Sequence, residues 1–322
     1  MGASGSSVHR LRTGDPVLIV ANGNPLSRRA DSMAQIAFRQ LKSSLQSHVE
    51  LVTTGYAGHA RAVAEAWAAE HLDGTIIAIG GDGTLNEIGN GILSATVAFG
   101  SRVVLVICGG GNANDQYRSW PLSQRIRLEH VTSAEPIPVD VLEVTYSTNN
   151  HKQPVAQYAL SYAAIGALAT GASVVNGRRR GMLADLALIP RTLLRARPVP
   201  VVIGGRLARV DSLSWHVIST MAKVFRVSAN SRRTDGLMEV ILVPHRRWPT
   251  ALRMSWFGVR AMVWPHRPSQ GVRMTFFWKQ GGAAQLDGET VDIPPGSHVT
   301  VRCVPAALRV LCCDMDASTR AL

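Results

Sequence analysis

Short apolar runs alternate with amphipathic stretches over the first 136 residues. Continuous apolar segments predict buried strands at 16–21, 49–53, 75–79 and 103–107. The intervening stretches have helical character: one follows a Gly-Asn-Pro turn at 23–25 and ends at Leu45, one covers 59–70 and one begins at Thr84. Alternating strands and helices predict a parallel sheet with helices on both faces.

The second half has a different pattern. Strand-like runs follow one another with little helix between them, which predicts a mostly antiparallel β domain. The expected strands are 139–145, 156–163, 215–220, 238–243, 272–277 and 299–303, with helices at 181–194 and 248–263. The fold class is therefore α/β with two domains, an N-terminal α/β domain and a C-terminal, mostly antiparallel β-sandwich. The first domain is expected at 14–136, completed by 305–314, and the second at 137–304, after a disordered tail at 1–14.

Composition agrees with two self-supporting domains. The chain has 322 residues, 46% of them hydrophobic, which is enough for two cores without disulfides. The four cysteines lack paired CxxC spacing, so we expect free thiols in a reducing compartment. The uncharged stretch 157–175 is too rich in small and polar residues to predict a membrane span.

The net charge of +12 lies entirely in the second half. Residues 1–136 carry 11 basic and 11 acidic residues, whereas 137–322 carry 23 basic and 11 acidic ones. Genome composition can explain why arginine replaces lysine, but not why the charge is asymmetric. We therefore expect the second domain to meet an anionic partner.

A glycine cluster, GGDGT at 80–84, follows the predicted strand 75–79 and leads directly into a helix. Backbone N–H groups at such a helix start, with the positive end of the helix dipole, favour a phosphate. Thr84 and Glu87 also fit a capping box, with Thr84 as the N-cap. The alternative is an ordinary tight turn between strand and helix. The segment matches neither the P-loop nor the GxGxxG fingerprint.

A second loop repeats the pattern, in VVLVICGGGNAND at 103–115. Two glycine loops on one sheet can hold one nucleotide. Asp82, Asp115 and Asp140 each occupy a junction beside a strand. Each alone is most often a turn residue, but together they predict a network that holds a metal or orients phosphate.

Another pair of carboxylates lies in QLDGE at 285–289. In an extended backbone, residues two apart point the same way, so Asp287 and Glu289 can face one site. The alternative is a solvated acidic hairpin turn.

These motifs, in this order, resemble the diacylglycerol-kinase catalytic-domain family of lipid kinases, which includes bacterial diacylglycerol kinases and the sphingosine and ceramide kinases. The resemblance covers nearly the whole chain. It rests on GGDGTLNE at 80–87, GNAND at 111–115, PVD at 138–140, DGLMEV at 235–240, LDGE at 286–289 and PAALRVL at 305–311. The first motif is shared with NAD kinases and phosphofructokinases, and the resemblance implies a nucleotide-binding domain of that fold.

The resemblance also implies a chemistry and a set of residues. ATP and Mg²⁺ are the expected cofactors, and a lipid hydroxyl is the expected phosphoryl acceptor. Glu289 or Asp287 would accept the proton, and Asp82, Asp115 and Asp140 would complete the catalytic set. The expected ATP-binding residues are Asn24, Thr54, Gly80, Gly81, Asp82, Gly83, Thr84, Leu85, Asn86, Gly111 and Asn112. Asp235 and Leu237 are the expected ligands of a structural metal.

Some positions depart from the family pattern. Asn112 stands where the family has threonine, and Arg232 stands where bacterial members carry an acidic metal ligand. The early Asn-Pro turn, NPLSR at 24–28, comes two residues later than in the family.

The expected enzyme is therefore a lipid kinase acting in the cleft between its two domains, cytoplasmic and peripheral at the inner membrane surface. Its basic second domain would contact anionic membrane, and the helix at 248–263 would pack into the core or offer an apolar face to the bilayer. Two alternative functions are a kinase of a soluble acceptor such as NAD and a non-catalytic lipid or nucleotide sensor. No nucleic-acid recognition motif occurs, so no nucleic-acid partner is expected, and a homodimer remains open.

Overall fold

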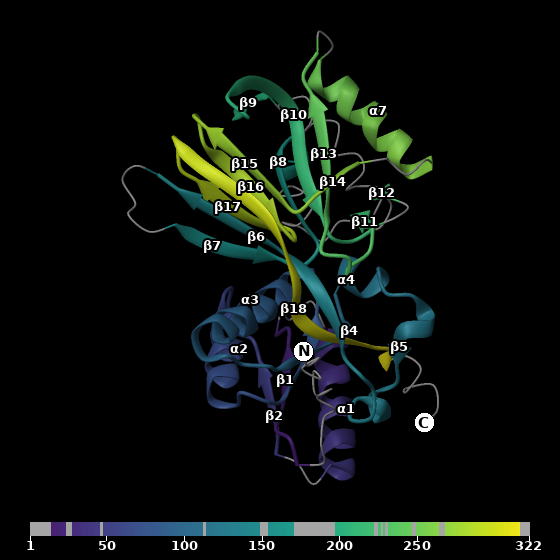
Figure 1. Cartoon of the computed structure of the whole chain (residues 1–322). Helices are drawn as coiled ribbons and strands as arrows, with labels where there is room; N and C mark the ends of the chain where they lie inside the picture. The colour runs from purple at the N-terminus through teal and green to yellow at the C-terminus, as the bar shows by residue number, and fades with distance from the viewer. Residues whose placement is uncertain are drawn as a thin grey trace, which may run out of the picture. The chain divides into compact units, whose positions relative to one another are not determined.

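A computed structural model of the chain describes residues 14–23, 28–45, 48–111, 114–148, 154–170, 197–221, 225, 226, 228, 231–246, 249–263 and 268–315. The chain forms two compact units (Figure 1). Unit 1 comprises Met1–Val139 and Ala307–Leu322, and unit 2 comprises Asp140–Ala306. The chain thus leaves unit 1, builds unit 2 and returns. The assignment of ATP to the first unit and of lipid to the second stays a prediction.

Unit 1 is built on a parallel sheet in the strand order β2-β1-β3-β4-β18. Apolar, β-branched runs form its central strands, and β1 and β3 are buried along their whole length. The strands are β1 (Val17–Ala21), β2 (Val49–Thr53), β3 (Thr75–Gly80), β4 (Val104–Gly109), β5 (Arg125–Ile126) and the end of β18 (Ser297–Cys313). The helices are α1 (Arg28–Ser44), α2 (His59–Glu70), α3 (Asp82–Phe99), α4 (Asp115–Arg118), η1 (Leu122–Gln124) and η2 (Leu128–His130).

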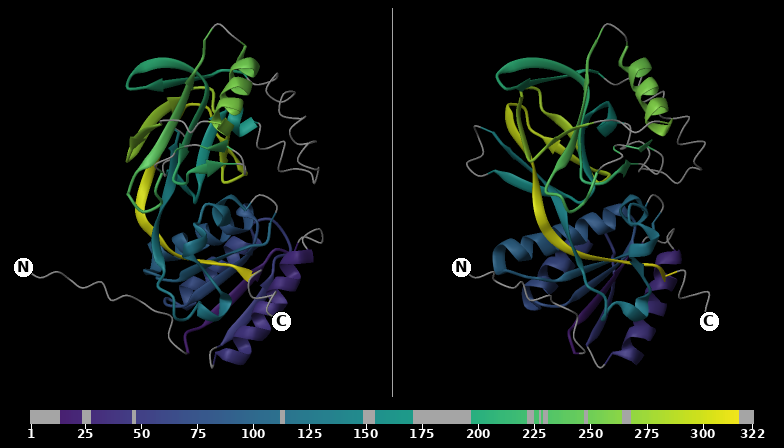
Figure 2. Two further views of the ribbon diagram at one scale, coloured as in Figure 1. Left: turned by 90° about the vertical axis from the view of Figure 1, so that its right-hand side faces the viewer. Right: turned by 45° about the vertical axis from the view of Figure 1, so that its right-hand side comes forward.

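Helices cover both faces of this sheet, α1 on one side and α2 with α3 on the other (Figures 1 and 2). Ala30, Ala34 and Ala37 of α1 pack on Ile19 and Ile77. On the other side, Gly91 lets α3 approach α2 closely, because a Cβ atom there would lie 2.5 Å from the carbonyl oxygen of Arg61. The alternation of elements predicted for this half is present.

Unit 2 is built on an antiparallel sheet in the order β17-β16-β8-β10-β9-β15-β18, in which β13 pairs with β10 and β14, and β6 pairs with β7 and β18. β11 and β12 form a separate two-stranded sheet. Its strands are β6 (Ile137–Ser147), β7 (Val155–Ala159), β8 (Tyr162–Gly166), β9 (Val199–Ile203), β10 (Arg206–His216), β11 (Thr220–Met221), β12 (Phe225–Arg226), β13 (Met238–Pro244), β14 (Ser269–Gly271), β15 (Arg273–Trp278), β16 (Gly282–Leu286), β17 (Glu289–Ile293) and β18. Its helix α7 covers Thr250–Val263.

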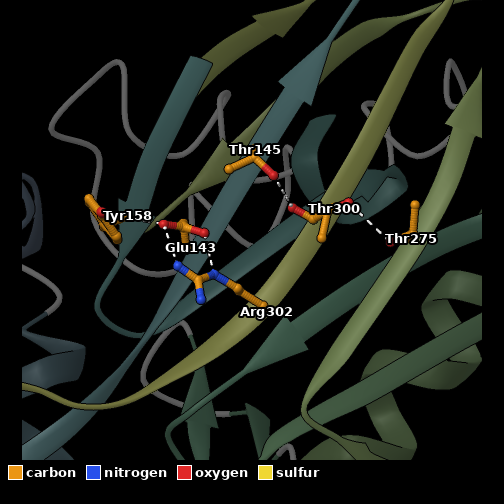
Figure 3. A network of polar contacts seen from close by, with 6 residues as sticks. All are labelled: Glu143, Thr145, Tyr158, Thr275, Thr300 and Arg302. Atoms are coloured by element: carbon orange, nitrogen blue, oxygen red, sulfur yellow. Dashed lines mark hydrogen bonds and ion pairs between the residues drawn. The ribbon is translucent and has the colours of Figure 1, made fainter. Parts of the chain in front are cut away.

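Side chains from several strands of unit 2 share an apolar core. Val144 of β6 and Val301 of β18 lie in it with Trp215 of β10, Phe276 of β15 and Leu286 of β16. Side chains alternate along a strand, and the opposite face of β6 and β18 is polar. There Arg302 binds Glu143, with Nη2 3.0 Å from Oε1, and Thr275 and Thr300 lie 3.0 Å apart through their hydroxyl oxygens (Figure 3).

Several predicted boundaries were wrong. The strand expected at 156–163 is two strands, because the chain breaks at Leu160 and Ser161. Strand β10 begins at Arg206, nine residues before the expected start at 215. Strands β16 and β17 were not predicted. The expected helix at 181–194 lies outside the described residues.

The predicted fold class is confirmed: parallel strands with helices in the first part of the chain, antiparallel strands in the second. Among the described residues, no helix combines the length and the hydropathy needed to cross a bilayer.

Candidate nucleotide and acceptor sites

The two glycine loops of unit 1 interlock. Strands β3 and β4 are neighbours whose ends pair at Gly80 and Gly109, and the Gly110 N–H donates to the Gly80 carbonyl at 3.0 Å. A Cβ atom on Gly111 would lie 2.2 Å from the Cα atom of Gly81. Only glycine allows backbone to meet backbone this closely. The loops predicted separately therefore form one backbone surface at the carboxyl edge of the sheet.

Helix α3 begins at this surface. Its N-cap is Gly81, which contributes no side-chain cap, and the first intrahelical bond runs from the Leu85 N–H to the Gly81 carbonyl at 3.0 Å. The backbone N–H groups of the first turn and the positive end of the helix dipole therefore favour an anion here. Asp82, Gly83, Thr84 and Asn86 belong to this first part of the helix, and Leu85 and Asn86 are buried.

The predicted capping box was wrong. Because α3 begins at Asp82, Thr84 and Glu87 both lie inside the helix. Glu87 instead caps α2: its Oε1 accepts the Gly58 N–H at 2.8 Å and its Oε2 accepts the Ala60 N–H at 3.1 Å. Helix α2 has no side-chain cap of its own at Gly58. The motif residue thus fixes one helix against the start of another.

Asp82 links the two loops. Its Oδ1 accepts the backbone N–H of Gln116 at 3.0 Å, one residue after Asp115. Asp115 is the first residue of α4 and is 4% exposed. Asn114 adopts the left-handed conformation, and its amide both accepts from the Gly111 N–H and donates to the Gly111 carbonyl, at 2.8 and 2.9 Å. Sequence reasoning missed these roles of Asn114 and Gln116, although Asn is the residue that most readily adopts this conformation and closes a loop on itself.

Thr54 lies at the same sheet edge. Its hydroxyl oxygen accepts the Gly23 N–H at 3.2 Å, and its own N–H donates to the Ala21 carbonyl at 2.9 Å. The Asn22 N–H reaches the Ile79 carbonyl at 3.0 Å, which ties the end of β1 to the end of β3. The structure therefore gathers Thr54 and the 80–83 loop on one edge of unit 1. Asn24 and Asn112 lie outside the described residues.

Asp140 has a structural place in unit 2. Its carboxylate accepts the Gly236 N–H at 2.7 Å and the Ala306 N–H at 2.9 Å, and its own N–H donates to the Arg233 carbonyl at 2.7 Å. The side chain is 2% exposed. Asp140 thus joins the residues where the chain enters and leaves this unit. Its catalytic part stays a prediction.

The expected metal ligands form a small turn. The exposed Asp235 accepts the Leu237 N–H through Oδ1 at 3.0 Å, and the exposed Arg232 lies in the same loop. No group of three or more His, Cys, Asp or Glu side chains that could hold a metal occurs in the described part of the chain. These residues alone do not fit a metal site built by the protein, so the structural metal stays a prediction.

The Asp287–Glu289 element is a tight hairpin, and the extended backbone assumed for it was wrong. Leu286 pairs with Glu289, and the two residues between them have positive φ, 50° at Asp287 and 97° at Gly288. Asp-Gly is a favoured sequence for such a two-residue turn. The two carboxylates therefore do not share a face by strand alternation.

Their environments differ sharply. Asp287 is 4% exposed, and its carboxylate accepts the backbone N–H groups of Ser161 at 2.8 Å and Tyr162 at 3.0 Å, together with that of Leu160. Glu289 is exposed. The predicted solvated turn is therefore wrong for Asp287, which stabilises the break between β7 and β8. Glu289 has the exposure that a group meeting a substrate requires.

Comparison with known proteins agrees with the predicted resemblance. Residues 16–144 match the family described as the diacylglycerol kinase catalytic domain. A crystal structure of a diacylglycerol kinase from Bacillus anthracis str. Sterne superposes with a TM-score of 0.62 at 16% identity, covering 92% of this chain and 96% of that one. A second structure from the same organism gives a TM-score of 0.65 at 17% identity and the same coverage. At this identity the structures show a shared fold. No curated protein matches the chain.

Proposed function

From the match of residues 16–144 to the diacylglycerol kinase catalytic domain family, we propose that the chain is an ATP-dependent lipid kinase. It transfers the γ-phosphoryl group of ATP to a hydroxyl of a lipid such as diacylglycerol or a sphingoid base. A kinase of this family uses ATP, so the nucleotide is the first requirement that the residues must meet.

The interlocked glycine loops are the observation that carries the proposal. A Cβ atom at Gly80 would lie 2.7 Å from the Cβ of Thr84, and one at Gly111 would meet Gly81. The loops thus present side-chain-free backbone at the start of an 18-residue helix. Close backbone approach and a helix dipole are what a polyphosphate needs. The residues present therefore fit ATP.

Asp82 supplies negative charge at this edge. It lies at the first residue of α3 and holds the α4 backbone through Gln116. Mg²⁺ is usually bound by one or two carboxylates together with substrate phosphates, and Asp82 fits that role. Held there with ATP, the ion would supply positive charge against the phosphates. Asp115, one residue before Gln116, is the first residue of α4 and is buried.

Glu289 is the proposed base. A lipid hydroxyl must lose its proton as the new P–O bond forms, and a carboxylate within hydrogen-bond reach removes it. Glu289 is exposed, whereas the Asp287 carboxylate already accepts backbone N–H groups. Asp287 therefore acts as a positioning residue, which holds the turn that carries Glu289.

The test is turnover with a panel of acceptors. The purified chain is incubated with labelled ATP, Mg²⁺ and diacylglycerol, a sphingoid base, phosphatidylglycerol or NAD, and the products are separated by chromatography. We expect label in a lipid product and none in NAD. The D82N variant is the matched blank, because it keeps the size of the side chain. Label in NAD alone, or no product with any acceptor, would overturn the proposal.

A further inference from the structure

Helix α7 turns large apolar side chains away from its own unit. Leu252 is 58% exposed and Trp256 is 70% exposed. Residues four apart lie on one face of a helix, so the two side chains form a single outward stripe. Met254 and Thr250, on the opposite side, are 4% and 6% exposed. The core packing expected for this helix therefore holds for one face only, and Figures 1 and 2 show α7 at the outside of unit 2.

A buried carboxylate fixes which face is outward. Asp211 of β10 is fully buried, and it accepts the Thr250 hydroxyl at 2.7 Å and the His245 Nδ1 at 2.8 Å. Arg253 of α7 forms an ion pair with the same carboxylate. Rolling α7 to hide Trp256 would break this pair and leave a buried charge without its partner, which is strongly unfavourable. The contacts that α7 makes with Asp211 therefore keep Leu252 and Trp256 on the exposed face of the helix.

The charge of the helix indicates what it meets. Its sequence, TALRMSWFGVRAMV, contains two arginines and no acidic residue. Arg260 is exposed and lies one further turn along the stripe of Leu252 and Trp256. Arg246, shortly before the helix, is also exposed. Arg302, on β18, is by contrast paired with Glu143. Tryptophan beside arginine on one face is typical of helices that lie in a membrane interface.

We propose that α7 docks the protein on an anionic bilayer, with Trp256 and Leu252 at the boundary between headgroups and acyl chains and Arg260 against lipid phosphates. The inference rests on the proposed function, because a lipid acceptor resides in a bilayer. An acidic protein surface is the competing occupant. The absence of acidic residues on α7 and the pairing of tryptophan with arginine favour the bilayer.

Vesicle sedimentation of the full chain tests this without any turnover. The vesicles contain phosphatidylcholine with or without phosphatidylglycerol, at low and high salt. We expect W256A and L252A each to lower binding to anionic vesicles about tenfold, and R260A to lower it about fivefold in a salt-sensitive way. The matched controls lie in unit 1: Tyr56→Ala, Leu122→Ala and Arg39→Ala. Tyr56 and Leu122 are 69% and 76% exposed.

A depth probe gives a second readout. Lipids brominated on their acyl chains quench tryptophan that enters the bilayer. We expect quenching in the unaltered chain and its loss in W256F, although phenylalanine still supports binding. The acceptor lipid adds a third comparison: W256A should phosphorylate a short-chain, water-soluble acceptor normally and a vesicle-embedded one poorly.

The outcomes separate the two proposals. Equal vesicle binding by W256A, L252A and the controls would overturn docking through α7, whether or not the chain phosphorylates lipid. Equal binding to neutral and anionic vesicles at all salt concentrations would overturn the role of Arg260. If the α7 variants lose vesicle binding but the unaltered chain has no kinase activity, the proposed function is overturned and α7 remains a membrane-binding surface.

Discussion

The carboxylate of Asp82 accepts the backbone N–H of Gln116 at 3.0 Å, so the first turn of α3 is tied to the first turn of α4. The bond connects the two loops that follow β3 and β4. A charge placed there acts on both loops at once. Asparagine can still accept this hydrogen bond through its carbonyl oxygen, so charge and geometry can be separated by one substitution.

Replacing Asp82 with Asn should lower phosphoryl transfer by at least about 100-fold, because an electrostatic contact to the transferring group is lost. The melting temperature should change little, since the bond to Gln116 remains. Asp73→Asn is the control, because Asp73 forms a surface pair with Arg102 in the same unit, 2.7 Å apart. Near-normal turnover by a folded Asp82→Asn chain would remove Asp82 from the site.

Replacing Gly111 with Ala should separate the two glycine loops. The added methyl would lie 2.2 Å from Gly81 Cα, and backbone must move to admit it. We expect a loss of about 1–3 kcal/mol in the free energy of unfolding and a weaker affinity for ATP, measured by denaturant titration and calorimetry. Gly271→Ala adds the same methyl where no atom lies within 4 Å. Unchanged ATP affinity in Gly111→Ala would show that the loops do not bind the nucleotide.

Substitutions at Glu289 and Asp287 should have different consequences. Glu289→Gln should lower kcat about 10²- to 10⁴-fold and leave the unfolding free energy unchanged, because the side chain is exposed. Asp287→Asn should cost about 1–3 kcal/mol in unfolding, because an amide nitrogen would face backbone N–H groups that the carboxylate now accepts. Steady-state kinetics of both variants measure kcat, and denaturant titration measures the free energy of unfolding. Normal turnover by Glu289→Gln would transfer the base to Asp287 or remove it from this turn.

Acid should destabilise the chain through His216. Burial lowers the pKa of His216 to about 3, below its usual value of 6.5. Between these two values the unfolded chain binds a proton that the folded chain does not, so stability falls as pH drops below about 6.5. The expected loss is about 1.4 kcal/mol per pH unit.

His216→Gln should flatten this dependence, measured by denaturant titration at pH 7 and pH 5. Gln can keep the contact that His216 Nε2 makes with the Ser214 hydroxyl at 2.9 Å. His48→Gln is the control, because the His48 side chain is 74% exposed. If the unfolding free energy of His216→Gln falls between pH 7 and pH 5 as much as that of the unaltered chain, other groups cause the loss.

The elements that a local sequence pattern defines were predicted best. Helix α2 and strand β2 lie at the predicted residues, because apolar period and turn residues define them within a short window. The glycine loops were also visible, since a strand, a glycine run and a helix follow one another directly. Their interlocking at Gly111 and Gly81 depends on strand order, which no local pattern contains.

Long-range partners limited the prediction of the site. Asp287 binds N–H groups 125 and 126 residues earlier in the chain, and Glu87 caps a helix that begins 28 residues before it. The sequence does not show whether a given carboxylate will accept hydrogen bonds from the backbone N–H groups of a distant segment. Trp256 shows the converse: an apolar residue on a helix predicts core, and only the packed structure reveals that it faces outward.

Strand β18 sets an order for folding during synthesis. Its first part pairs with β15 of unit 2, and Arg309–Cys313 pair with β4 of unit 1. Most of unit 1 leaves the ribosome first. On its side away from β3, however, β4 has no neighbouring strand until these late residues emerge. An unpaired strand edge in a nascent chain is a site for mispairing and aggregation. The sheet of unit 1 therefore cannot be completed until the last residues of β18 have emerged, and until then the β4 edge is a site where a chaperone would act during translation.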